Sequence, residues 1–93
     1  MPYTYILECS DGSYYTGSTW SLDGRVAEHA SGNGCAYTKE RLPVKLVYWE
    51  EHDRIEDAFV REKQVQRWSR AKKKALVEGH REELKKRAKS RLQ

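Results

Sequence analysis

The chain has 93 residues, the size of one small domain with a modest hydrophobic core. Its 18 Lys and Arg residues outnumber its 14 Asp and Glu residues, and the resulting net charge of +4 favours anionic partners such as nucleic acid. The sequence shows no membrane-spanning run, no signal peptide, no disulfide framework and no zinc-site spacing. We therefore expect a cytoplasmic protein with reduced thiols.

The first predicted element is a β-hairpin. Residues 3–9 are rich in aromatic and β-branched side chains, which predicts a strand. Asp11, Gly12 and Ser13 have the composition of a hairpin turn, and residues 14–18 form the second predicted strand.

Ser21 is a candidate N-cap for a helix over residues 22–30, and the glycine-containing segment 31–34 ends that helix. We expect a loop from there to Pro43, and a third strand over residues 45–51.

Two further helices follow. Asp53 is the expected N-cap of a helix over residues 54–68, whose buried face is predicted to contain Ile55, Ala58, Phe59 and Val65. A shorter helix is expected over residues 70–78 and is predicted to break at Gly79. Residues 1–80 are then one domain, and residues 81–93 a basic tail that is helical or frayed. The order ββαβαα predicts an α+β fold with a small, mainly antiparallel three-stranded sheet.

Glu62 interrupts the apolar face of the helix predicted over residues 54–68. A carboxylate at such a position is costly unless it has a partner. One interpretation is a partly exposed Glu paired with an Arg or Lys. The other is a metal ligand, because one carboxylate with waters and a substrate phosphate often holds Mg²⁺.

Arg25 and His29 lie one turn apart beside the apolar stripe of the first predicted helix. They form either a solvated edge or a functional pair, since an Arg binds a phosphate bidentately and a His binds a phosphate or moves a proton. Tyr5 and Tyr15 are placed to converge across the hairpin, where each either packs in the core or contributes its hydroxyl to chemistry. Gly17 permits either a bulge or the close approach of another group.

Together these residues resemble the GIY-YIG nuclease superfamily, and most closely its small stand-alone bacterial members. The paired signature of that superfamily is similar to the segments 3–5 and 15–17, and the resemblance covers about residues 3–78. Arg25, His29 and Glu62 stand where the superfamily carries its helix Arg, a His one turn later in many members, and its metal-binding Glu. The chain departs from the pattern at Tyr3, Thr4 and Thr16, and it has Ser18 where some members carry a Lys. An Asn that some members carry near the metal Glu has no clear match.

The resemblance implies a DNA endonuclease that uses one divalent ion, Mg²⁺ or Mn²⁺. It implies that Glu62 holds the metal, that Arg25 faces the scissile phosphate, and that Tyr5 is the general base, with Tyr15 tuning the site. His29 is either the rival base or a supporting group that contacts the phosphate or transfers a proton, because its reference pKa of about 6.5 suits proton transfer better than that of a phenol. Gly17 is expected to have a structural role in the motif.

The expected partner is DNA, with single-stranded or branched forms favoured over sequence-specific sites. The basic residues expected to contact its backbone, besides Arg25, are Arg67, Arg70, Lys72 and Lys73, although Trp68 among them is more typical of a core residue. The alternative function is a nucleic-acid-binding module that has the same fold but no catalytic activity. The sequence leaves the oligomeric state and the pathway open.

Overall fold

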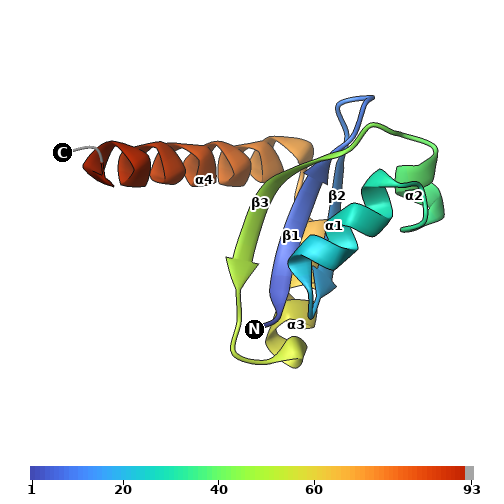
Figure 1. Cartoon of the computed structure of the whole chain (residues 1–93), viewed down its shortest axis with the longest axis horizontal. Helices are drawn as coiled ribbons and strands as arrows, with labels where there is room; N and C mark the ends of the chain where they lie inside the picture. Colours follow the sequence, from blue (N-terminus) through green and yellow to red (C-terminus); the bar gives the residue numbers. More distant parts are fainter. Residues whose placement is uncertain (92–93) are drawn as a thin grey trace.

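The computed structural model describes the backbone of residues 1–91 and the side chains of residues 1–88. In chain order the elements are β1 (Tyr3–Glu8), β2 (Tyr14–Thr19), α1 (Leu22–Ala30), α2 (Ala36–Lys39), β3 (Lys45–Glu51), α3 (Ile55–Gln66) and α4 (Arg70–Arg91) (Figure 1). This arrangement confirms the α+β prediction. The short helix α2 lies in the segment expected to be a loop.

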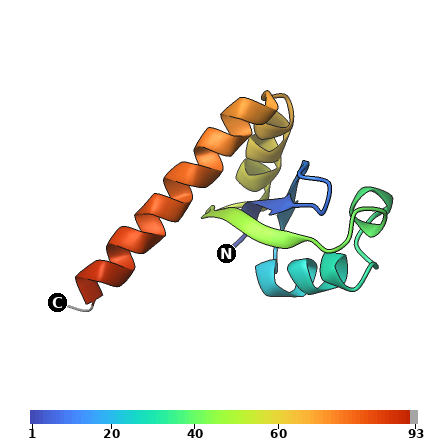
Figure 2. The same ribbon diagram turned by 90° about the horizontal axis from the view of Figure 1, so that it is seen from above.

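The sheet has the strand order β2-β1-β3, and both neighbours run antiparallel to β1. The central strand is buried on both faces, since Thr4, Tyr5, Ile6 and Leu7 are all buried although adjacent side chains point to opposite sides. Helix α1 covers one face, and α3 lies against the other (Figure 2). The two faces therefore present different side chains to different helices.

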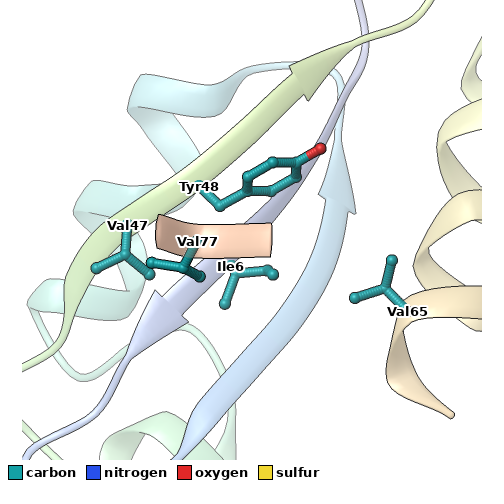
Figure 3. Close-up of a cluster of buried hydrophobic side chains, with 5 residues drawn as sticks. All are labelled: Ile6, Val47, Tyr48, Val65 and Val77. Carbon is teal, nitrogen blue, oxygen red and sulfur yellow. The ribbon is translucent and has the colours of Figure 1, made fainter. Parts of the chain in front are cut away.

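The apolar core lies between the sheet and the helices α3 and α4. It consists of five side chains from β1, β3 and these helices: Ile6, Val47, Tyr48, Val65 and Val77 (Figure 3). Trp68 is partly buried against this cluster, so the interpretation of Trp68 as a core residue is confirmed.

Helix α3 buries a slightly different face from the one predicted. Ala58, Glu62 and Val65 are buried, but Phe59 is 51% exposed, so its assignment to the core was wrong. With 3.6 residues per turn, positions 58, 62 and 65 centre the buried stripe so that position 59 falls beyond its edge. The helix also begins later than predicted, because Arg54 rather than Asp53 occupies the N-cap position.

The predicted helix break at Gly79 was also wrong, because α4 continues through this residue to Arg91. A single interior glycine costs a helix only about 1 kcal/mol relative to alanine, and strong helix formers flank it here. Whether residues 81–93 act separately from residues 1–80 stays a prediction, and Leu92 and Gln93 lie outside the described residues. Over residues 1–91, no helix is long and apolar enough to cross a membrane.

Gly79→Ala is expected to stabilise the protein by about 1 kcal/mol, because the added methyl group would meet nothing within 4 Å beyond the neighbouring residues and backbone of its own helix, and alanine is the better helix former. Thermal unfolding is the measurement, and Tm should rise by roughly 4–8 °C. The matched control is Gly32→Ala, which should lower Tm because Gly32 has a φ of 87°. An unchanged or lower Tm for Gly79→Ala would show that α4 is not a continuous helix in solution.

Candidate active site

Three of the predicted site residues meet on the face of the sheet that α1 covers. The Tyr5 hydroxyl lies 3.0 Å from Nε2 of His29, and both residues are buried. Tyr15 comes from β2, the other strand of the hairpin, and the centroid of its ring lies 5.1 Å from that of His29. Tyr5 and Tyr15 therefore converge, as the hairpin pattern predicts, and His29 is the residue on which they converge.

Gly17 makes room for the Tyr5 ring. The two residues are paired across β1 and β2, and a Cβ atom on residue 17 would overlap the Tyr5 hydroxyl. Gly34 does the same for His29, because a Cβ atom there would overlap the imidazole ring. Each glycine lets backbone pass directly over a ring of the site.

Arg25 is the cation nearest to this cluster. Its guanidinium group donates a 3.0 Å hydrogen bond to the Glu28 carboxylate, and it lies close enough to the Tyr5 hydroxyl to oppose the effect of burial on the pKa of that phenol. Its side chain is 29% exposed, whereas Tyr5 is 1% exposed. Arg25 is therefore the part of the cluster that solvent, or a phosphate, reaches first.

The hydrogen bonds of His29 assign its tautomer. Nδ1 of His29 lies 2.8 Å from the Thr38 hydroxyl; when that hydroxyl donates to the backbone carbonyl of Cys35 at 3.4 Å, its oxygen accepts from Nδ1–H of His29. With that tautomer Nε2 is unprotonated and accepts a 3.0 Å hydrogen bond from the Tyr5 hydroxyl. Both ring nitrogens are occupied and the ring is fully buried, which leaves neither nitrogen for a phosphate.

The pKa values follow from burial. Burial lowers the pKa of His29, and the nearby Arg25 charge lowers it further, so the imidazole is neutral at neutral pH. Burial raises the pKa of Tyr5, although Arg25 opposes that effect. The pKa of Tyr15 is raised by burial and by the nearby Cys35 thiol. Both phenols are therefore protonated in the resting site.

Glu62 reaches β2 from the opposite face of the sheet. Its Oε1 accepts a 2.7 Å hydrogen bond from the Ser18 hydroxyl, and its Oε2 accepts one of 3.1 Å from Gln66 and lies 3.4 Å from Nζ of Lys63. Ser18 follows Gly17, so successive residues of β2 contact Glu62 on one face and Tyr5 on the other.

Two hydrogen bonds hold α3 in the position that places Glu62. The Thr4 hydroxyl on β1 donates to the carbonyl of Ala58 at 2.9 Å, and the Gln66 amide donates to the carbonyl of Thr16 at 3.3 Å. They lie on either side of Glu62 along the helix, one turn away in each direction. The carboxylate is therefore fixed against the sheet, and its side chain is only 12% exposed.

No group of three or more His, Cys, Asp and Glu side chains that could hold a metal ion occurs in the described part of the chain. A divalent ion at Glu62 would thus have one protein carboxylate and otherwise water or phosphate oxygens. This donor set fits Mg²⁺, which keeps most of its waters and is commonly bound through one or two carboxylates.

Sequence patterns did not reveal Thr38, Cys35 or Gly34 as members of the site. Their contribution depends on the approach of α2 to α1, and hydrophobic periodicity carries no signal for such a contact.

The predicted backbone-binding residues other than Arg25 lie at the end of α3 and the start of α4. Arg67, Arg70 and Lys72 are exposed, and Lys73 is half-buried. Arg70 donates to the carbonyl of Gly12 at 2.9 Å, and Nζ of Lys72 lies 4.2 Å from the ring centroid of Trp68. These cations are separate from the cluster around Tyr5 and His29.

Comparison with known proteins places this geometry in a family. The chain is 47% identical over 76 residues to a UPF0213 protein of Halobacterium salinarum, a match that covers 82% of this chain and 99% of that protein. It is 44% identical over 75 residues to a UPF0213 protein of Staphylococcus saprophyticus, covering 81% of this chain and 92% of that one. The NMR structure of a UPF0213 protein from Bacillus halodurans is 47% identical, covers 84% of both chains and superimposes with a TM-score of 0.54.

Residues 1–75 match the GIY-YIG catalytic domain, which includes every residue of the cluster described above and Glu62. GIY-YIG proteins are nucleases that act on nucleic acid and generally use divalent metal ions. This match covers most of the chain and agrees with the relatives, and the chain therefore belongs to the GIY-YIG catalytic domain family.

Proposed function

We propose that this chain is a metal-dependent DNA endonuclease that hydrolyses phosphodiester bonds, with Tyr5, Tyr15, Arg25, His29 and Glu62 as its active site. The observation that carries the proposal is the buried Tyr5 hydroxyl 3.0 Å from Nε2 of His29, with the Arg25 guanidinium near enough to affect the pKa of that phenol. A phenol with a cation on one side and a neutral imidazole on the other can pass on its proton as it receives one.

The contacts of His29 with Tyr5 and Thr38 support one direction of proton transfer. Tyr5 takes a proton from the attacking water while its own proton moves to Nε2 of His29. The resulting imidazolium keeps its Nδ1–H bond to Thr38. In this proposal His29 acts behind Tyr5 rather than as the base that contacts water, and the complete burial of its ring supports that assignment.

Arg25 controls access of water and substrate to the Tyr5 hydroxyl and to His29 behind it. Its exposed guanidinium group binds the scissile phosphate and stabilises the charge that develops in the transition state. Movement of Arg25 toward the phosphate would open the buried Tyr5 hydroxyl to water. Glu62 would hold Mg²⁺ or Mn²⁺, which supplies a positive charge beside the reacting phosphate oxygens when bound.

Exposed aromatic rings near the site favour single-stranded or branched DNA. Trp20, directly after β2, is 66% exposed, and Tyr37 is 37% exposed with its ring 5.9 Å from that of Tyr15. Arg41 covers part of Tyr37 at 3.9 Å. Aromatic rings of this kind stack with unpaired bases without reading their sequence. Selectivity for structure rather than sequence, and a role in DNA repair, recombination or processing, belong to this proposal.

Glu62→Gln is expected to abolish metal-dependent cleavage while the protein stays folded, since the amide keeps the shape but loses the charge that binds the cation. The measurement is cleavage of labelled single-stranded, duplex and branched DNA with Mg²⁺, Mn²⁺ or EDTA. The matched control is Glu56→Gln, an exposed carboxylate on the same helix, which should cleave as the wild type does. Binding without cleavage by wild type and variant alike would instead establish the non-catalytic binding module.

The cleavage rate is expected to fall on the acid side with an apparent pKa below 6.5. His29 must be neutral to accept the Tyr5 proton, and its pKa is lowered, so the rate is constant above that pKa and declines as pH falls through it. Single-turnover rates between pH 5 and pH 8 test this. His29→Gln should be slower and lose the acid limb. An acid limb at or above pH 6.5 would contradict a buried, neutral His29.

Thr38→Val is expected to slow cleavage roughly 10- to 100-fold, a range typical of losing the partner that orients a functional histidine. The Val side chain has the shape of Thr but accepts no hydrogen bond from Nδ1–H, so His29 is free to place its proton on Nε2. ¹⁵N NMR of His29 should report the Nδ1–H tautomer in wild type and a mixture in the variant. Thr38→Ser should restore both tautomer and rate, and a Thr38→Val protein with wild-type values for both would refute this role.

A further inference from the structure

The charge of this chain is divided unevenly between its helices. Helix α4, residues 70–91, carries ten of the 18 Lys and Arg residues and three of the 14 Asp and Glu residues, a formal charge of +7. Residues 1–69 carry the other eight basic and 11 acidic residues, a formal charge of −3. The part of the chain that contains the candidate active site is therefore acidic, and the net positive charge comes entirely from α4.

Helix α4 packs against the rest of the fold through its first half. Arg70 contacts the hairpin turn through the carbonyl of Gly12, and Leu76, Val77 and His80 lie against the sheet. Beyond these residues the helix projects past β3 (Figures 1 and 2). Every described side chain from residue 81 to residue 88 is exposed. Its 22 residues span about 33 Å at 1.5 Å per residue.

The GIY-YIG match ends at residue 75, whereas α4 continues for several turns beyond it. The outer half of the helix is therefore a feature of this chain outside the matched domain. Hydrophobic packing holds this outer half only weakly, because Leu84 is the only large apolar side chain that it exposes among the described residues.

Basic residues recur on one side of α4. Arg70, Lys74, Arg81 and Lys85 are separated by four, seven and four positions, which places them on the same helical face. Arg81 and Lys85 pair with Glu78 and Glu82 at 3.6 and 3.9 Å, but such exposed pairs within one helix are weak and exchange readily for a phosphate.

We propose that α4 is the arm through which this chain binds the phosphate backbone of double-stranded DNA flanking the cleavage site, an inference that rests on the proposed function. An extended row of cations fits a phosphate backbone, whose charges repeat along the duplex and whose counterions are released on binding. A membrane surface suits α4 poorly, since an interfacial helix needs an apolar face and the described part of α4 exposes almost none.

The test measures binding without cleavage. In the Glu62→Gln background, a fluorescent duplex of about 30 base pairs is titrated with protein at several KCl concentrations between about 50 and 200 mM. Arg81→Gln combined with Lys85→Gln is expected to weaken binding and to reduce the slope of log K against log[salt] by about 1.8, or about 0.9 for each phosphate that the protein no longer neutralises. The matched control is Lys39→Gln combined with Arg54→Gln, two exposed cations outside α4, which should leave the slope unchanged.

Exchanging the two basic residue types gives the rescue. Arg81→Lys with Lys85→Arg keeps both charges and should keep the wild-type slope. Equal slopes for the Gln pair and the wild type, or equal reductions in the Gln pair and the control pair, would overturn the proposal. So would binding of anionic vesicles or an acidic protein through α4 with DNA affinity unaffected. Because this experiment needs no cleavage, its failure is distinct from failure of the endonuclease activity.

Discussion

The hydrogen bond between Tyr5 and His29 is the contact on which both the fold and the site depend. It joins the central strand to α1, and the bond from His29 to Thr38 extends the connection to α2. All three side chains are buried, and a buried polar group left without a partner costs several kcal/mol. The chain of hydrogen bonds that would transfer the proton therefore also fixes the α1 side of the sheet, so its geometry is set before any substrate arrives.

Close backbone approach is the second requirement, and it explains why glycines flank the site. Gly17 and Gly34 lie directly over the rings of Tyr5 and His29, where a Cβ atom would overlap ring atoms. Larger residues would push both rings apart and break the 3.0 Å contact between them. The second glycine of the family signature is thus explained by the space that Tyr5 occupies and not by a turn, because Gly17 lies inside a regular strand.

The sequence was sufficient for the elements whose signal is local, but not for the contacts between them. Alternation and turn residues predicted the hairpin, and helical spacing predicted that Glu62 is buried on α3. The same spacing misplaced Phe59, because the exact direction of the buried stripe depends on how α3 lies against β2. The predicted helix break at Gly79 was wrong because the free-energy cost of one glycine in a helix is smaller than the summed helix preference of its neighbours. Thr38 had no local signal, and its importance comes from a histidine nine positions earlier.

The separation of charge between α4 and the remainder of the chain constrains how an arm could assist catalysis. The Debye length is about 8 Å at physiological ionic strength, so cations on the outer half of a helix about 33 Å long do not offset the negative charge around Glu62. Under the proposed function, that task would fall to Arg25 and to a divalent ion held at Glu62. The arm acts instead by holding the substrate close, which raises the effective concentration of phosphodiester bonds near Arg25. DNA affinity would then depend on the basic residues of α4 and bond cleavage on the residues of the candidate active site, so that a substitution could change one property without changing the other.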